Sequence, residues 1–449
     1  MSRDLRRLRP VLSRWMSLRH WKSQAAFLSG GLLVGLVAVF VAIGADKAQA
    51  LFFTLRQHAV WLPLLLTPAG FAASAYATRR WFRGAQGSGI PQVIAASELS
   101  RHHPGSVGKL VSLRIVTGKI ALLFLGLACG APIGREGPSV QIGAALMRFT
   151  GRFGAVANEG ALLLAGGAAG VAAAFNTPLA GIVFAIEELG KSFEQRTSGT
   201  VIFTVMLAGV ASLGLIGDYT YFGRDTASIS GWPDALAIVI CGITGGALGG
   251  TFARLTVFAS RRMGSLFGGV TVRHPVLFAA VCGLSLAVLG TLSGGLAFGT
   301  GYADAKALLA GSQSMGPGYG PIRILAALIS AFSGIPGGLF APSLSAGAGV
   351  GGDLHWLLPM VPLTTLALLG MVGYFSGVVQ APLTAFVIVM EMTNDHNMVI
   401  PLIATSLLAY GVSRLICPRP LYHSLAQGFV KQERPRRPAK AAADLPQGE

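Results

Sequence analysis

A short charged motif, Gly134-Arg135-Glu136-Gly137-Pro138, interrupts a long apolar stretch of this chain. Residues 120–133 before it carry no charge, and an apolar segment begins again at Ser139. Glycine and proline break a helix here, and hydrocarbon tolerates such a break only where it lines a cavity inside the protein. A carboxylate at this depth is costly and by default marks an ion or proton pathway. The alternative is a hydrophilic loop in which Glu136 is simply solvated.

The composition excludes a soluble enzyme with a single anchor. Of the 449 residues, 52% are hydrophobic and only 12% are charged, which predicts a multi-pass protein of the lipid bilayer. The formal net charge is +17, but the basic residues cluster beside apolar runs and do not form a surface for nucleic acid. We interpret these clusters as cytoplasmic flanks. They lie at residues 3–22, 79–83, 261–262 and 431–440.

No cofactor or metal site is expected. The four cysteines have no metal-ligand spacing and lie in or beside apolar stretches, so we expect packing residues and no disulfide framework. They are Cys129, Cys241, Cys282 and Cys417. The pair His102-His103 and the segment Asp395-His396 are each expected in a loop.

The apolar segments differ in length. The first two expected spans, residues 25–43 and 62–78, have basic flanks on one side, which places the N-terminus in the cytoplasm as a retained lead-in and not a cleaved signal peptide. Short apolar segments cut by glycine or proline suggest half-helices that meet near the membrane midplane. The long segments are 201–215, 235–252 and 276–292, and the short ones are 139–149, 178–186, 343–350 and 382–390.

An internal repeat relates the two halves of the chain. A shift of 204 residues, without gaps, aligns the Gly/Pro ladder of residues 130–139 with that of residues 334–343. It also pairs Gly143 with Gly347, Gly166 with Gly370, Pro178 with Pro382 and Glu187 with Glu391. The repeat predicts a basic segment 1–24, two homologous membrane halves, 25–225 and 226–430, and a disordered cytoplasmic tail, 431–449. The residues alone leave open whether the halves are inverted or parallel.

Three Gly/Pro motifs, at residues 87–91, 134–138 and 338–342, each have the form of a helix start. A helix N-terminus offers unsatisfied N–H groups and a partial positive charge, both of which suit an anion. Several such ends aimed at one point would bind an anion without a buried cation, which would hold the ion too tightly for fast passage. An ordinary membrane turn is the alternative for any single motif.

These motifs resemble the signature sequences of the CLC family of chloride channels and chloride/proton antiporters. They read GSGIP, GREGP and GLFAP in the family's order, and the resemblance extends from the first span to Tyr422. It implies an all-α polytopic membrane protein of the CLC type, built from two inverted repeats of tilted and broken helices. It also implies a homodimer with one ion pathway per subunit, and chloride and protons as the transported partners.

The resemblance also implies the site residues. The central anion would be held by the hydroxyls of Ser88 and Tyr422 and by the backbone N–H groups of Leu339 and Phe340. Further N–H groups, from Arg135 to Gly137, would form an outer site. Glu136 would be the gate, since its charged carboxylate competes with chloride for the same N–H groups and links anion occupancy to protonation.

A second acid separates an antiporter from a channel. Antiporters of the family use an inward-facing glutamate to deliver protons, and Glu188 matches that position. Glu187 has a repeat mate and is therefore expected to be structural. The alternative is that both residues end a helix in water or pair with Lys191. Lys119 is expected either near the pathway or at a membrane interface.

The predicted function is chloride/proton exchange in a bacterial inner membrane, with both termini cytoplasmic. A passive chloride channel on the same fold is the alternative. Within the family, Ser88 argues against nitrate-preferring members, and Ser88 with Tyr422 argues against fluoride exporters. An intramembrane enzyme that pairs Glu136 with Glu187 has no second catalytic motif to support it.

Overall fold

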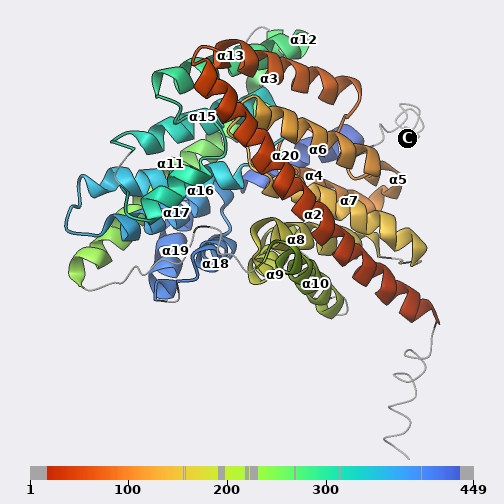
Figure 1. Cartoon of the computed structure of the whole chain (residues 1–449). Coiled ribbons are helices and arrows are strands. Elements are labelled where there is room, and N and C mark those ends of the chain that lie inside the picture. The colour runs from red at the N-terminus through yellow and green to blue at the C-terminus, as the bar shows by residue number, and fades with distance from the viewer. Residues whose placement is uncertain are drawn as a thin grey trace, which may run out of the picture.

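The computed structural model describes residues 18–154, 156, 158–190, 198–217, 222, 231–266, 269–312, 315–395 and 397–434. The described part of the chain is helical and has no strand beyond one isolated bridge between Gly134 and Gly338. Figure 1 shows α2 running obliquely across the molecule, with α4–α7 on one side and α15–α19 on the other. The helices are α2 (Leu18–His58), α3 (Pro63–Arg80), α4 (Ile90–His102), α5 (Pro104–Val107), α6 (Leu113–Ala128), α7 (Glu136–Phe153), α8 (Glu159–Phe175), α9 (Pro178–Phe184), the π-helix η1 (Ala185–Leu189), α10 (Ser198–Ile216), α11 (Trp232–Leu266), α12 (Val270–Arg273), α13 (Pro275–Leu292), α14 (Tyr302–Leu309), α15 (Tyr319–Ser333), α16 (Phe340–His355), α17 (Leu363–Val379), α18 (Pro382–Thr393), α19 (Val399–Ile416) and α20 (Leu421–Glu433).

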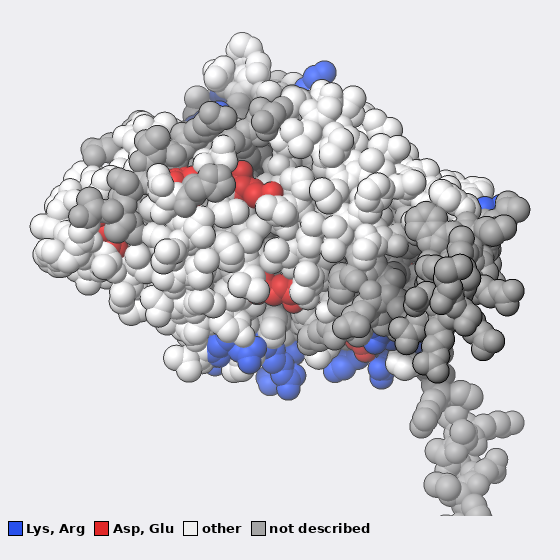
Figure 2. Space-filling model, turned by 90° about the horizontal axis from the view of Figure 1, so that it is seen from below, with Lys and Arg blue, Asp and Glu red and all other residues white. Residues whose placement is uncertain are grey.

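The outer surface is that of a multi-pass membrane protein. Four described helical segments are long and apolar enough to cross a bilayer. Large apolar side chains point outward along them, including Phe40 on α2, Leu292 on α13 and Ile400 on α19, which are 59%, 83% and 79% exposed. Figure 2 shows a mostly uncharged face with a few Asp and Glu side chains within it, and most of the visible Lys and Arg side chains lie along its lower edge. The four segments are Trp21–His58, Trp232–Arg262, Pro275–Leu292 and Val399–Ile416.

Helix boundaries in the two halves recur at the 204-residue spacing of the sequence repeat. Both ends of α17 lie 204 residues after the corresponding ends of α8, and α16 starts 204 residues after α7. The paired glycines explain part of this repetition. A Cβ atom at Gly143 would collide with the carbonyl oxygen of Gly166, and one at Gly347 would lie 2.7 Å from that of Gly370. The crossings of α7 with α8 and of α16 with α17 are therefore too close for any side chain.

Two glutamates bind the helix starts of the opposite half. The carboxylate of Glu187 accepts hydrogen bonds from the N–H groups of Leu383 and Thr384 at the start of α18, at 3.1 and 2.6 Å. Reciprocally, Glu391 accepts from Leu179 and Ala180 at the start of α9, at 3.1 and 2.6 Å. A negative charge at a helix N-terminus satisfies unpaired N–H groups and interacts favourably with the helix dipole. The two halves are thus joined by a symmetric pair of caps.

Several boundaries differ from the sequence-based expectation. Helix α2 is much longer than the expected span 25–43, and α7 and α16 extend beyond the short segments 139–149 and 343–350. Helix α20 continues to Glu433, so the first residues of the predicted tail are helical. Residues 1–17 and 435–449, Lys191 and His396 lie outside the described part of the chain.

All four cysteines are buried and free, as predicted.

Candidate anion and proton pathway

The three Gly/Pro motifs are joined by backbone hydrogen bonds. Gly134 and Gly338 exchange two of them, at 2.8 and 2.7 Å, which brings the equivalent loops of the two halves together. The first motif joins the third through Gly87, whose carbonyl oxygen accepts from the N–H group of Gly337 at 3.0 Å. The expected convergence of the three motifs is therefore present in the structure.

Each motif leads directly into a helix. Helix α4 has Gly89 as its N-cap, with φ of 108°, a conformation that a larger residue would adopt only with strain. Helices α7 and α16 have Arg135 and Leu339 as their N-caps, at equivalent places in the two halves. The first N–H groups of a helix have no partner within it, so these starts present donors where the loops meet.

Two buried hydroxyl groups lie among these helix starts. Ser88 is in the loop before α4, and Tyr422 is in the first turn of α20, which packs on α4. The two hydroxyls face each other, yet neither makes a hydrogen bond of ordinary geometry within the described part of the chain. A side chain at Gly137 would overlap the Ser88 hydroxyl, so this glycine lets α7 approach the first motif. Buried donors without protein partners are suited to an anion.

Glu136 is fully buried at the first position of α7. Its carboxylate folds back over Gly134 and faces the N–H groups of Ala341 and of Glu136 itself, at the starts of α16 and α7. The carboxylate therefore lies where two helix N-termini meet. A solvated loop glutamate, the alternative considered above, is wrong.

An aromatic cluster surrounds the start of α16. The ring of Phe340, which is 0% exposed, stands 4.9 Å from that of Phe375 and 6.0 Å from that of Tyr422, measured between ring centroids. Phe175 and Phe184 pack against it from α8 and α9. These rings pack closely around the start of α16. Phe175, Phe184 and Phe375 could not be recognised as neighbours of the site from the sequence, because any apolar helix contains such residues.

Three polar side chains fix the loop that carries Ser88. Lys119 on α6 is fully buried, and its Nζ donates to the carbonyl oxygens of Ala85 and Gly87 at 2.8 and 2.6 Å. Gln92 donates to the carbonyl oxygens of Gly84 and Gln86, and Gln141 also donates to that of Gly84. The interface position considered for Lys119 is therefore wrong, because its amino group is buried against the backbone of the first motif.

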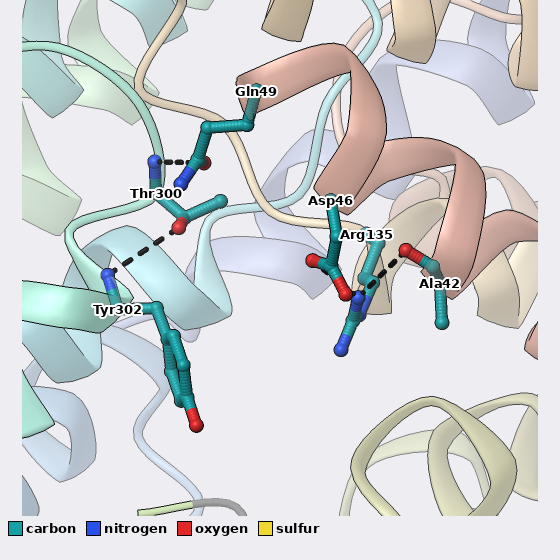
Figure 3. Close-up of polar contacts among 6 residues, drawn as sticks. All are labelled: Ala42, Asp46, Gln49, Arg135, Thr300 and Tyr302. Atoms are coloured by element: carbon teal, nitrogen blue, oxygen red, sulfur yellow. Dashed lines mark hydrogen bonds and ion pairs between the residues drawn. The ribbon is translucent and has the colours of Figure 1, made fainter. Parts of the chain in front are cut away.

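The side chain of Arg135 is directed away from the helix starts, toward α2. Its Nη1 donates to the carbonyl oxygen of Ala42 at 3.0 Å and to Oδ1 of Asp46 at 2.9 Å. Figure 3 shows this contact, with Tyr302 of α14 on the other side of the same space. These two contacts connect the start of α7 to α2.

The two neighbouring acids of η1 have different surroundings. Glu187 reaches the start of α18 and is a cap, which agrees with the expected structural role. Glu188 is buried, and its Oε1 lies 3.4 Å from Nδ1 of His423. A π-helix adds a residue to a turn and is frequent at functional sites, and here it lets adjacent glutamates point to different partners. The contact with His423 was not predicted, since η1 and α20 are far apart in sequence.

Titratable residues do not form a metal site in the described part of the chain, where no group of three or more His, Cys, Asp or Glu side chains could hold an ion. His102 is exposed but is the last residue of α4, so the expected loop position is wrong for it, and His103 follows as the C-cap of that helix. Asp395 follows α18 as expected, but it is buried, and its Oδ1 accepts from the N–H group of Asn397 at 2.9 Å.

Comparison with known proteins agrees with this arrangement. The family model described as "Voltage gated chloride channel" matches residues 69–414. A relative from Yersinia pestis bv. Antiqua (strain Angola), named H(+)/Cl(-) exchange transporter ClcA, is 32% identical over 433 residues, which cover 90% of this chain and 87% of the relative. A transporter of the same name from Salmonella typhimurium is 30% identical and covers 92% of this chain and 90% of its own. The chain belongs to the voltage-gated chloride channel (CLC) family.

The fold has a solved counterpart. The crystal structure of a slow cyanobacterial Cl⁻/H⁺ antiporter has a TM-score of 0.79 to this structure, with 24% sequence identity. The match covers 92% of this chain and 99% of the antiporter. The all-α CLC-type fold predicted from the sequence is thus confirmed.

Proposed function

We propose that this protein exchanges chloride for protons across a bacterial inner membrane. The names of the bacterial relatives support exchange, and they are names of transporters and not of enzymes. The observation that carries the proposal is the Glu136 carboxylate, which is fully buried where the starts of α7 and α16 meet. A carboxylate and a chloride ion compete for the same N–H groups, so movement of one is linked to the other.

In this mechanism, Ser88, Tyr422 and the N–H groups of Leu339 and Phe340 hold the central chloride. The N–H groups from Arg135 to Gly137 hold the outer anion when the Glu136 side chain leaves. Protonation removes the charge with which Glu136 competes, and the neutral side chain then yields its position to chloride. Glu188 supplies protons to Glu136 from the cytoplasmic side. Glu188 is buried, and its carboxylate lies close enough to interact electrostatically with Tyr422. Both observations support that role.

The proposal includes an orientation and an assembly. The basic edge in Figure 2 supports a cytoplasmic face that carries both termini. Lys109 and Glu433 form an ion pair at 3.0 Å, which holds the end of α20 beside the segment after α5. The proposal also includes a homodimer with one ion pathway per subunit, which membership of the family supports. No cofactor takes part, and chloride is the transported ligand.

A passive chloride channel is the second candidate, because the matching family model carries a channel's description. Purified protein in liposomes distinguishes the two. An outward chloride gradient should drive protons into liposomes against a proton gradient when a potassium ionophore clamps the voltage. Chloride flux without uphill proton movement would contradict exchange and establish a channel.

A further inference from the structure

The internal acid Glu188 has a histidine beside it. Nδ1 of His423 lies 3.4 Å from Oε1 of Glu188, and this buried nitrogen has no hydrogen-bond partner among the residues that the structure describes. The His423 side chain is 19% exposed, whereas that of Glu188 is 3% exposed. The imidazole therefore joins a buried carboxylate to the protein surface.

The position of His423 in the fold matches a role in proton entry. It follows Tyr422 in α20, and α20 extends from that buried tyrosine to Glu433, which pairs with the exposed Lys109. Histidine is the side chain whose ordinary pKa, about 6.5, allows it to gain and lose protons near neutral pH.

We propose that His423 carries protons between the cytoplasmic solution and Glu188. The solution protonates the ring to imidazolium, and the Nδ1–H bond then breaks as an O–H bond forms on Oε1 of Glu188. The ring returns to its neutral form with its remaining proton on Nε2, and the carboxylate becomes a carboxylic acid. A flip of the ring then turns the unprotonated nitrogen toward the solution, where it takes up the next proton. The same steps reversed release a proton. This proposal rests on the proposed exchange function and gives Glu188 its connection to solvent.

Other ionisable groups do not replace Glu188 as the partner. In the described part of the chain, Glu188 supplies the sole carboxylate oxygen within 4.0 Å of His423. The charged or titratable side chains of the helices packed on α20 belong to α4, α11 and α17. They are Glu98, Arg101 and His102 on α4, Asp234, Cys241, Arg254, Arg261 and Arg262 on α11, and Tyr374 on α17, while α20 itself adds Tyr422, Lys431 and Glu433.

The first test measures the number of protons moved per chloride in liposomes, for wild type, His423→Gln and His102→Gln. This ratio does not depend on the fraction of active protein. His423→Gln should lower it several-fold and weaken the dependence of proton flux on cytoplasmic-side pH, because an amide does not take up a proton. The exposed His102 is the matched control and should behave as wild type.

The second test is chemical rescue, which a merely structural role would not produce. Imidazole added on the cytoplasmic side should raise the proton flux of His423→Ala several-fold and leave that of His423→Ala/Glu188→Val unchanged. Wild-type proton-to-chloride ratios and pH profiles in His423→Gln and His423→Ala would overturn the relay. A reduced ratio in His423→Ala that imidazole does not restore would also overturn it. Wild-type protein that moves chloride without protons would instead contradict the exchange function itself.

Discussion

At the residue scale, the site is defined by polar groups that the fold buries and does not pair. The hydroxyls of Ser88 and Tyr422 are held among helix starts whose N–H groups also lack intrahelical partners. Burying a polar group without a partner is costly, and an anion bound among the helix starts would supply the missing partner for these two hydroxyls. The chloride ion that we propose at this place would accept hydrogen bonds from these donors.

Removal of one hydroxyl should weaken chloride binding. Tyr422→Ala or Ser88→Ala deletes a donor aimed at the anion, and a hydrogen bond to a charged group is worth about 1.5 to 3 kcal/mol. We expect chloride affinity to fall about tenfold or more in calorimetric titration, with looser proton coupling. Tyr374→Phe is a control, because the Tyr374 ring packs on Phe252 of α11. Unchanged affinity and coupling in both site variants would remove these hydroxyls from the site.

Substitutions of the adjacent acids Glu187 and Glu188 in η1 should have different effects. Glu188→Val should abolish proton movement while chloride still passes, because the anion ligands do not include this carboxylate. Glu187→Gln should leave coupling intact and act on stability, because its carboxylate caps α18. Proton flux and chloride flux in liposomes measure both effects. Full coupled exchange in Glu188→Val would transfer the relay role to another residue.

At the element scale, the reciprocal caps predict a matched loss of stability. Glu187→Gln and Glu391→Gln each replace a carboxylate that accepts two N–H groups at a helix start by a neutral amide. Each change should cost about 1 kcal/mol. Thermal unfolding in detergent should show a similar decrease for the two variants. A large decrease in only one of them would contradict the symmetric role.

The close helix crossings predict a second effect on stability. Gly166→Ala and Gly370→Ala place a Cβ against backbone atoms of the facing helix and should cost about 1 to 3 kcal/mol. Gly411→Ala on α19 is the control, because a Cβ there meets no atom within 4 Å, and the higher helix propensity of alanine should keep or raise stability. Equal unfolding temperatures in all three variants would contradict this account of the crossings.

Most of the helix starts and helix pairings were predictable from the sequence. The Gly/Pro ladders identified the helix starts, and the repeat paired the correct helices. The cross-half bonds of Glu187 and Glu391 were not predictable, because they depend on how the halves face each other, which residue spacing leaves open. The contact of Glu188 with His423 was missed for the same reason. Lys119 was noticed as a charge in an apolar run, but its carbonyl partners belong to a distant loop.

At the scale of the whole molecule, the apolar surface and the basic edge predict a topology. His58 at the end of α2 should face outside, whereas Arg80 at the end of α3 and Gln427 on α20 should face the cytoplasm. A membrane-impermeant maleimide applied to intact cells should label His58→Cys and spare Arg80→Cys and Gln427→Cys. Background should be low because the native cysteines are buried. The opposite labelling pattern would contradict the orientation.

The outer anion position predicts a structural difference. Glu136→Ala removes the carboxylate that faces the N–H groups of Ala341 and Glu136, so a halide ion should take its place. Crystals of this variant grown with bromide should show additional anomalous density beside Gly134, compared with wild-type crystals grown in the same way. Identical halide density in the two would contradict competition between the carboxylate and the anion.

The central claim is that Glu136 couples chloride to protons, and Glu136→Gln tests it most directly. The amide resembles the protonated carboxyl, cannot compete as an anion and cannot carry a proton. In liposomes with an outward chloride gradient, wild type should move protons uphill. Glu136→Gln should keep chloride flux but lose both its pH dependence and all coupled proton movement. Wild-type coupled exchange in Glu136→Gln would contradict the mechanism.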